Sequence, residues 1–191
     1  MRPKAPEANP PLIVRLVWGA VGGLFGARLV RAGVDVTFIA RGETLRALRS
    51  RGIRIESSEG DFYVPRVAAT DDFAEVAPAD AVLVAVKAGQ IAGLASALRP
   101  LLVPRTVVIP LQNGAEAAEQ LAALLGREHV LGGFCRVIAQ QVGPGHIRHS
   151  GVVPTVALGI VPESRVGLVA EALQSALRQA GIRVEEPEDL G

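Results

Sequence analysis

Short apolar runs rich in Val, Ile and Leu alternate along the chain with longer segments in which apolar residues recur every three or four positions. Runs of the first kind are typical of buried strands, and segments of the second kind are typical of amphipathic helices. Strands that alternate with helices form a parallel sheet covered by helices on both faces. From residue 12 onwards the pattern therefore predicts an α/β fold with a doubly wound, mostly parallel sheet.

The first half of this pattern predicts two strand-helix units followed by an insert. The units comprise a strand at 12–17, a helix ending near 32, a strand at 34–39 and a helix at 43–51. Two short runs, 53–57 and 62–67, then flank Ser58-Glu59-Gly60-Asp61, which has the composition of a turn. We expect these runs to form a small antiparallel hairpin outside the parallel sheet.

The second half continues the alternation as far as a final strand. Its predicted elements are a strand at 81–86, a helix at 90–98, a strand at 106–111, a helix at 115–125, strands at 130–134, 136–142 and 146–149, a helix at 164–180 and a strand at 182–185. Residues 1–11 contain four prolines and no apolar pattern, so we expect a disordered tail there. We expect one dinucleotide-binding domain over 12–186 and a short linker at 187–191.

Charge and cysteine content narrow the function classes. The net charge is +1, with 20 basic and 19 acidic residues, so no overall field favours nucleic acid or an anionic membrane. The single cysteine, Cys135, is interpreted as a core residue, and no Cys/His group has the spacing of a metal site. An intracellular, cytoplasmic protein without a metal is the simplest interpretation.

One apolar stretch, 12–30, follows Arg2 and Lys4 and has the alternative interpretation of a signal peptide or a membrane span. Arg15 and Arg28 interrupt it, glycine and alanine cluster at its centre, and a second strand-like run follows at once. We therefore interpret it as a strand, a turn and a helix.

The turn after the first predicted strand, Gly19-Ala20-Val21-Gly22-Gly23, matches the last part of the G-x-G-x-x-G motif of Rossmann-type dinucleotide-binding domains. Gly19 would let the backbone approach a pyrophosphate, and Gly22 would let the helix pack closely on the strand. Val17 occupies the place of the motif's first glycine, and Trp18 the position beside the phosphates. The alternative is that the glycines only permit close helix packing.

Arg41 follows the second predicted strand, where an NAD-binding domain usually carries Asp or Glu for the ribose hydroxyls. A guanidinium at this position can bind a 2′-phosphate through two parallel hydrogen bonds. Arg41 therefore favours NADP over NAD, and the alternative is an ordinary surface arginine.

Two further polar residues follow predicted strands, where ligands of an open parallel sheet bind. Lys87 comes directly after six apolar residues, so its ammonium could contact a carbonyl or phosphate oxygen, or simply reach water. Asn113 could hold a nicotinamide amide or a ribose, although Asn-Gly is also a turn signal. His146 and His149 are three residues apart, on opposite faces of a strand, and are expected to be structural or solvated.

Taken together, five segments resemble ketopantoate reductase, also called 2-dehydropantoate 2-reductase. The resemblance spans about residues 12–160 and rests on the order and spacing of the segments. They are Gly19-Ala20-Val21-Gly22-Gly23, Phe38-Ile39-Ala40-Arg41-Gly42, Val86-Lys87-Ala88-Gly89-Gln90, Leu111-Gln112-Asn113-Gly114 and Gly143-Pro144-Gly145-His146-Ile147.

This resemblance implies NADPH-dependent reduction of ketopantoate, a small 2-keto acid, to pantoate on the way to pantothenate and coenzyme A. It implies that the glycine turn binds the pyrophosphate and that Arg41 binds the 2′-phosphate. It also implies that Lys87, Gln90 and Asn113 line the nicotinamide side, Lys87 and Asn113 being the catalytic candidates. The family's general-acid lysine and substrate-binding glutamate belong to a C-terminal helical domain, which we expect this chain to lack, so the isolated chain should be weakly active or inactive.

A second hypothesis is a non-catalytic binding or interaction module whose nucleotide site has decayed. Val17 and Trp18 motivate it, because Val17 replaces the motif's first glycine and Trp18 fills the position beside the phosphates. Under either hypothesis, the absence of a partner domain would leave an apolar face exposed, and such faces drive association. We therefore expect a homodimer.

Overall fold

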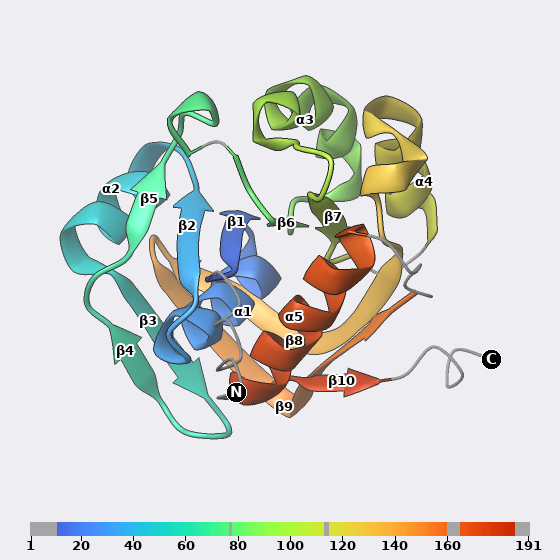
Figure 1. Cartoon of the computed structure of the whole chain (residues 1–191). Coiled ribbons are helices and arrows are strands. Elements are labelled where there is room, and N and C mark those ends of the chain that lie inside the picture. The colour runs from blue at the N-terminus through green and yellow to red at the C-terminus, as the bar shows by residue number, and fades with distance from the viewer. Residues whose placement is uncertain (1–10, 77, 113–114, 160–164, 186–191) are drawn as a thin grey trace, which may run out of the picture.

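The computed structural model describes residues 11–76, 78–112, 115–159 and 165–185, and its centre is a parallel sheet, sheet A (Figure 1). Every pair of neighbouring strands in it is parallel, as predicted. The strand order is β5-β2-β1-β6-β7, so the chain reverses direction across the sheet between β1 and β6. Such a reversal opens a crevice at the carboxyl ends of the two strands, where ligands of this architecture bind. The strands are β1 (Ile13–Val17), β2 (Asp35–Ile39), β5 (Ala68–Thr70), β6 (Ala81–Val84) and β7 (Val107–Pro110).

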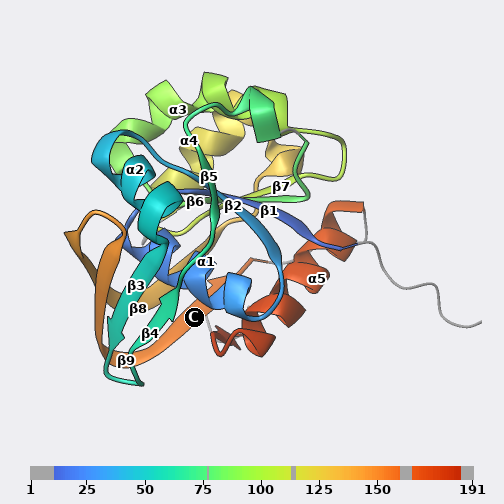
Figure 2. The same ribbon diagram turned by 90° about the vertical axis from the view of Figure 1, so that its left-hand side faces the viewer.

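Helices cover both faces of sheet A (Figure 2), which confirms the doubly wound fold. In that view α3 and α4 lie above the sheet, and α1 and α5 lie below it. The α-helices are α1 (Ala20–Arg31), α2 (Gly42–Arg51), α3 (Ile91–Leu98), α4 (Ala115–Leu125) and α5 (Arg165–Gln179). Short 3-10 helices occur at Ala74–Val76, Ala88–Gln90, Arg99–Leu101 and Arg127–His129.

A second, mixed sheet, sheet B, packs beneath α1. The predicted hairpin is confirmed, because β3 and β4 pair antiparallel. It is not an isolated insert, however, since β3 also pairs in parallel with β9, which pairs with β8 and β10. The strands are β3 (Ile53–Ser57), β4 (Phe62–Val64), β8 (Gly133–Gly143), β9 (His146–Leu158) and β10 (Arg183–Glu185).

The core consists of two clusters, one on each face of sheet A. The larger cluster joins sheet A, α1 and sheet B through side chains such as Leu16, Phe38 and Ile147. The smaller cluster lies under α3 and α4 and includes Val84 and Ile91. Burial of these apolar side chains fixes α1 between the two sheets and so fixes the position of the turn that precedes it.

Several predicted boundaries were wrong. The predicted strands at 130–134 and 136–142 form one strand, β8, with a register shift between Arg136 and Ile138 instead of a break. β9 continues to Leu158, far past the predicted end. β5 was not predicted, because Ala-Ala-Thr has too few apolar residues to show a strand pattern. β4 and β6 end two or three residues before their predicted ends.

The apolar stretch 12–30 divides into β1, a turn and α1, as interpreted. Its arginine in β1, Arg15, is buried, and its Nε donates to the carbonyl oxygen of Val76 at 2.7 Å. The pKa of Arg15 is lowered by burial, which outweighs the opposite effect of the nearby Asp35 and Asp80 carboxylates. Within the described residues no helix is both long and apolar enough to span a bilayer.

Candidate functional site

Two adjoining cavities lie at the carboxyl ends of the central strands, and both are lined by Trp18, Val86 and Gln90. The first, the arginine cavity, has a volume of about 410 Å³. It is further lined by Val17, Ile39, Ala40, Arg41, Thr44, Phe73, Gly93 and Leu94. The second, the amide cavity, has a volume of about 790 Å³. It is further lined by Gly19, Ala20, Val21, Ala85, Lys87, Leu111, Gln112, Cys135, Val137, Ala139, Gln140 and Gln141.

The glycine turn between β1 and α1 is shaped by its contact with the end of β6. A Cβ atom on Gly19 would lie 2.0 Å from the carbonyl oxygen of Ala85, and one on Gly22 would lie 2.6 Å from the Ala85 Cβ. Close packing therefore requires both glycines, which for Gly22 was expected under either interpretation. Gly19 is the N-cap of α1 and provides no side chain to cap the first turn, and Ala20 and Val21 of that turn line the amide cavity.

Val17 is an ordinary strand residue rather than part of the turn. It pairs with Ile39 of β2 and with Val84 of β6 in regular parallel register, and it is buried. No non-glycine residue in the described part of the chain has a positive φ, so Val17 is not strained. Valine at the place of the motif's first glycine thus fits the regular strand geometry.

Trp18 leans away from the sheet edge towards α1 and β8. Its ring packs edge-on against Phe38, with ring centroids 5.8 Å apart, and lies beside Gly23. Its indole Nε1 donates a hydrogen bond of 2.9 Å to Oε1 of Gln141, which comes from β8. Trp18 therefore forms a wall shared by the two cavities, and its partner could not be foreseen because 123 residues separate the two.

Arg41 is the N-cap of α2 and is exposed in the arginine cavity. Its guanidinium makes no hydrogen bond or ion pair with any residue that the structure describes. Apolar side chains of Ile39, Phe73 and Leu94 line the same cavity and provide surfaces for a flat ring. The arrangement places an uncommitted cation beside an apolar wall, which suits a phosphorylated nucleoside.

Lys87 and Gln90 lie in the connection between β6 and α3. β6 ends at Val84, so Lys87 follows the strand by three residues rather than directly. The backbone amide of Lys87 donates to Oε1 of Gln90 at 3.2 Å, and the amide of Gln90 donates to the carbonyl oxygen of Lys87 at 2.9 Å. Both residues line the amide cavity, and Gln112 lines it too while donating to the carbonyl oxygen of Val86. Asn113 lies outside the described residues.

Residues of β8 line much of the amide cavity, and the sequence pattern did not reveal them. Among them Cys135 is buried, as predicted, and its thiol donates to the carbonyl oxygen of Leu111 at 3.4 Å. Burial raises the pKa of Cys135 to about 11, so the thiol stays protonated at neutral pH. A protonated thiol is a poor nucleophile, and Cys135 therefore acts as a wall of the cavity.

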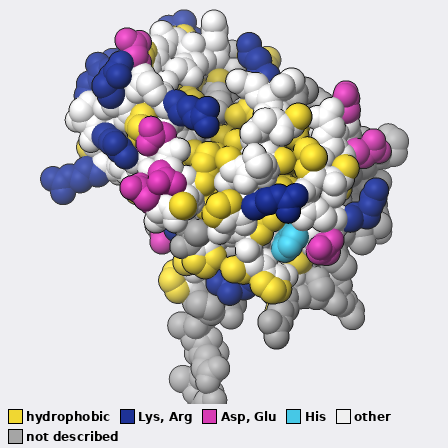
Figure 3. Space-filling model, turned by 90° about the horizontal axis from the view of Figure 1, so that it is seen from above, with side chains coloured by type: hydrophobic (Ala, Val, Ile, Leu, Met, Phe, Trp, Pro, Cys, Tyr) yellow, Lys and Arg dark blue, Asp and Glu magenta, His cyan; other side chains and the backbone are white. Residues whose placement is uncertain are grey.

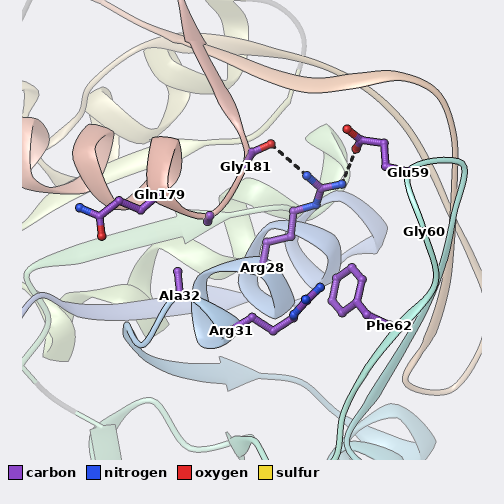
Figure 4. A pocket seen from close by; sticks show the side chains of 9 residues that line it. Arg28, Arg31, Ala32, Glu59, Gly60, Phe62, Gln179 and Gly181 are labelled. Carbon is purple, nitrogen blue, oxygen red and sulfur yellow. Dashed lines mark hydrogen bonds and ion pairs between the residues drawn. The ribbon is translucent and has the colours of Figure 1, made fainter.

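A distal pocket of about 420 Å³ lies between the C-terminal end of α1, the β3-β4 turn and the end of α5 (Figure 4). Its Arg28 donates to the carbonyl oxygen of Gly181 at 3.0 Å and pairs with the Glu59 carboxylate at 2.5 Å. The Arg31 guanidinium lies 4.4 Å from the centre of the Phe62 ring. These groups hold the three elements together, so we assign the pocket a structural role.

The remaining candidates carry no site. His149 is buried, with Nδ1 2.8 Å from Oγ of Ser57 and Nε2 3.0 Å from the carbonyl oxygen of Val152, so it is structural as expected. Among the described residues no group of His, Cys, Asp and Glu could hold a metal ion. Hydrophobic side chains gather on the face over α3 and α4 (Figure 3), where a shallow groove contains Ala92 and Leu124.

Comparison with known proteins identifies the architecture around the two cavities. The family model of ketopantoate reductase PanE/ApbA matches residues 18–163, and so begins at Trp18. The chain belongs to the ketopantoate reductase family. A 2-dehydropantoate 2-reductase of a Nostoc species is 35% identical over 176 residues, which are 90% of this chain and 54% of that protein.

Solved structures of the family agree. The crystal structure of 2-dehydropantoate 2-reductase from Geobacter metallireducens has a TM-score of 0.81 and 32% identity, covering 90% of this chain and 57% of that one. A PanE/ApbA family ketopantoate reductase from Ralstonia eutropha has a TM-score of 0.81 and 33% identity, covering 92% and 56%. The chain therefore spans little more than half the length of these family members and matches the architecture of their N-terminal domain.

Proposed function

We propose that the chain is the cofactor-binding half of an NADPH-dependent reductase that converts a small 2-keto acid, ketopantoate in the family's reaction, to the 2-hydroxy acid. The observation that carries the proposal is the uncommitted guanidinium of Arg41, in a cavity that adjoins the glycine turn. Membership of the ketopantoate reductase family supports the reaction class.

The residues of the two cavities suit the parts of a dinucleotide. Arg41 would hold the 2′-phosphate, with the adenine against Phe73 and Leu94 in the arginine cavity. The uncapped first turn of α1, at Ala20 and Val21, would hold the pyrophosphate. The amide cavity would hold the nicotinamide, whose C4 hydride is the reductant.

Two polar residues at the amide cavity, together with Asn113, would orient the reacting groups. The Lys87 ammonium is exposed there and could bind the carboxylate or the carbonyl oxygen of a keto acid. Gln90 and Asn113 would position the cofactor beside it. Because the chain spans about half of its relatives, we expect the isolated chain to bind cofactor and to turn over weakly or not at all.

Cofactor titration tests the proposal. Trp18 is the only tryptophan and lines both cavities, so its fluorescence should report occupancy directly. We expect NADPH to bind at least about tenfold more tightly than NADH, because a phosphate hydrogen-bonded to a guanidinium is a charge-assisted contact. Equal affinity for the two, or no binding of either, would contradict the proposal.

A second candidate is a non-catalytic binding module, and the position of Trp18 favours it, because the ring stands beside the glycine turn and is held there by its hydrogen bond to Gln141. Calorimetry without detectable dinucleotide binding would support this candidate over the first.

Under either proposal we expect a cytoplasmic homodimer that binds neither nucleic acid nor membranes. Exposed side chains on β8 and β9, including Ile138 and Val152, motivate the dimer, and a monomeric mass in light scattering would contradict it.

A further inference from the structure

We propose that Thr44 is a second hydrogen-bond donor to the 2′-phosphate, and that Trp18 and Gln141 set the direction in which its hydroxyl donates. This inference rests on the proposed function, because it concerns the same phosphate beside Arg41. Thr44 and Arg41 lie three residues apart in the first turn of α2 and line the same cavity.

A chain of two hydrogen bonds connects the turn after β1 to the start of α2 by way of β8. Nε1 of Trp18 donates to Oε1 of Gln141 at 2.9 Å. Nε2 of the same Gln141 side chain donates to Oγ1 of Thr44 at 3.2 Å. The three residues come from parts of the sequence that are far apart, and only the packing of sheet B against α1 brings them together.

The indole N-H of Trp18 determines which group donates and which accepts in both hydrogen bonds. An indole nitrogen is a donor only, so the amide of Gln141 must turn its oxygen towards Trp18. The amide nitrogen, also a donor only, then faces Thr44, whose hydroxyl oxygen must accept. The hydroxyl hydrogen of Thr44 is consequently left for another acceptor, and no described residue accepts it.

The cavity supplies the place for that acceptor. Thr44 is half-buried, and its neighbour at the cavity wall is Arg41, the cation without a protein partner. A phosphate has enough acceptor positions to receive hydrogen bonds from the guanidinium and from a hydroxyl at once. A hydroxyl whose hydrogen points into the cavity donates a charge-assisted hydrogen bond to such a phosphate and only a weaker, neutral one to the ribose hydroxyl of NADH, so it favours the phosphorylated cofactor.

Trp18 is well suited to anchor this chain. Its ring is held by Phe38 and by close contact with the α1 backbone at Gly23, so its N-H has a fixed direction. Gln141 is exposed, and an exposed glutamine samples many rotamers unless both ends of its amide are bound. An indole N-H at position 18 therefore acts on selectivity for the phosphate.

The first test measures the hydroxyl alone, by calorimetric titration of the full chain with adenosine 2′,5′-bisphosphate and with adenosine 5′-monophosphate. Thr44→Val should weaken binding of the bisphosphate about tenfold, because a hydrogen bond to a charged group is lost. It should leave binding of the monophosphate unchanged within about twofold. Thr44→Ser, which keeps the hydroxyl, should retain most of the preference for the bisphosphate.

The second test reverses the direction of the hydrogen bond between residue 141 and Thr44. In Gln141→Glu the carboxylate accepts from both neighbours, so the hydroxyl of Thr44 turns to donate to it and no longer faces the cavity. Gln141→Glu should weaken binding of the bisphosphate about tenfold or more in the otherwise unaltered protein. In the Thr44→Val background Gln141→Glu should weaken binding of the bisphosphate less, through its added negative charge alone. Equal losses of affinity in both backgrounds would overturn the proposed coupling of Gln141 to the Thr44 hydroxyl.

A third variant tests the anchor. Trp18→Phe keeps an aromatic ring and removes the N-H, so it should lower the preference for the bisphosphate about threefold while the chain's thermal unfolding stays cooperative. An unchanged preference would overturn the role of Trp18. If the unaltered chain bound neither adenylate, the proposed function would fail together with this inference. If it preferred the bisphosphate and Thr44→Val kept that preference, the inference alone would fail.

Discussion

The arginine cavity and the distal pocket have nearly equal volumes, about 410 and 420 Å³, and arginines line both. They differ in what those arginines already contact. Arg28 is bound to Glu59 and Gly181, and Arg31 stacks on Phe62. Arg41 has no such partner among the described residues, although it lies beside a wall of apolar side chains.

This difference shows that charge and volume alone do not identify a ligand site. A guanidinium that is already paired gains little from an incoming anion, because the anion must first displace a carboxylate. An unpaired guanidinium in a preformed hollow has no such competitor. The arginine cavity is lined by Val17 and Trp18, which precede α1, whereas the distal pocket lies at the other end of that helix. Ligands of an open parallel sheet bind at its carboxyl edge.

The largest expected effect, on the free energy of unfolding, comes from a substitution that distorts the glycine turn and leaves the distal pocket unchanged. In Gly19→Ala the new methyl group would overlap the carbonyl oxygen of Ala85, so β6 and the turn must separate. We expect a loss of about 3 kcal/mol in the free energy of unfolding, measured by urea denaturation. Gly93→Ala in α3 is the control, since no atom lies within 4 Å of its new Cβ, and a similar loss there would refute the explanation.

Removing the uncommitted charge should have the next largest effect. Arg41→Gln should weaken NADPH binding about 10- to 100-fold, because a charge-assisted hydrogen bond is worth about 1.5–3 kcal/mol. Binding of NADH should stay within about twofold. The matched control is Arg46→Gln on the same helix, whose side chain is exposed and paired with Glu43. If both variants reduced NADPH binding equally, the effect would be one of net charge rather than of the site.

Replacing an arginine that already has protein partners should lower the free energy of unfolding and leave the preference for NADPH over NADH unchanged. Arg28→Met deprives Glu59 and the Gly181 carbonyl of their shared donor, so we expect a loss of about 1–2 kcal/mol in the free energy of unfolding. The preference for NADPH over NADH should not change. A variant with normal thermal unfolding and altered cofactor preference would reverse the roles assigned to the two hollows.

The smallest expected effect concerns Cys135, at the wall of the amide cavity. Its pKa is raised from 9.0 to about 11 by burial, so the protonated thiol contributes stability that is complete below pH 9 and is lost as the pH rises towards 11. Alkylation by iodoacetamide at pH 7.5 should be much slower than that of glutathione. Cys135→Ala should leave NADPH affinity within about twofold, and a large loss would mean that the thiol contacts the cofactor.

Elements with a strong local pattern could be predicted from the sequence. The strands of sheet A and the helices that follow them have the apolar spacing of their type, and α4 was predicted to the residue. The positions of Arg41 and Lys87 near the carboxyl edge followed from the strand pattern, because parallel strands share that edge. Residues 1–10 and 186–191, with Asn113, lie outside the described residues, so those predictions remain untested.

The sequence by itself determined the doubly wound sheet and the glycine turn, because each depends on local patterns, and it determined the family through the order of five short segments along the chain. Sheet B depended on tertiary structure, since β3 pairs with β9, which lies far along the chain, and both share a core with α1. The contact of Trp18 with Gln141 and Thr44 depended on it as well. Such long-range contacts arise from the burial of shared apolar surface, and no local pattern encodes which distant residues that burial brings together.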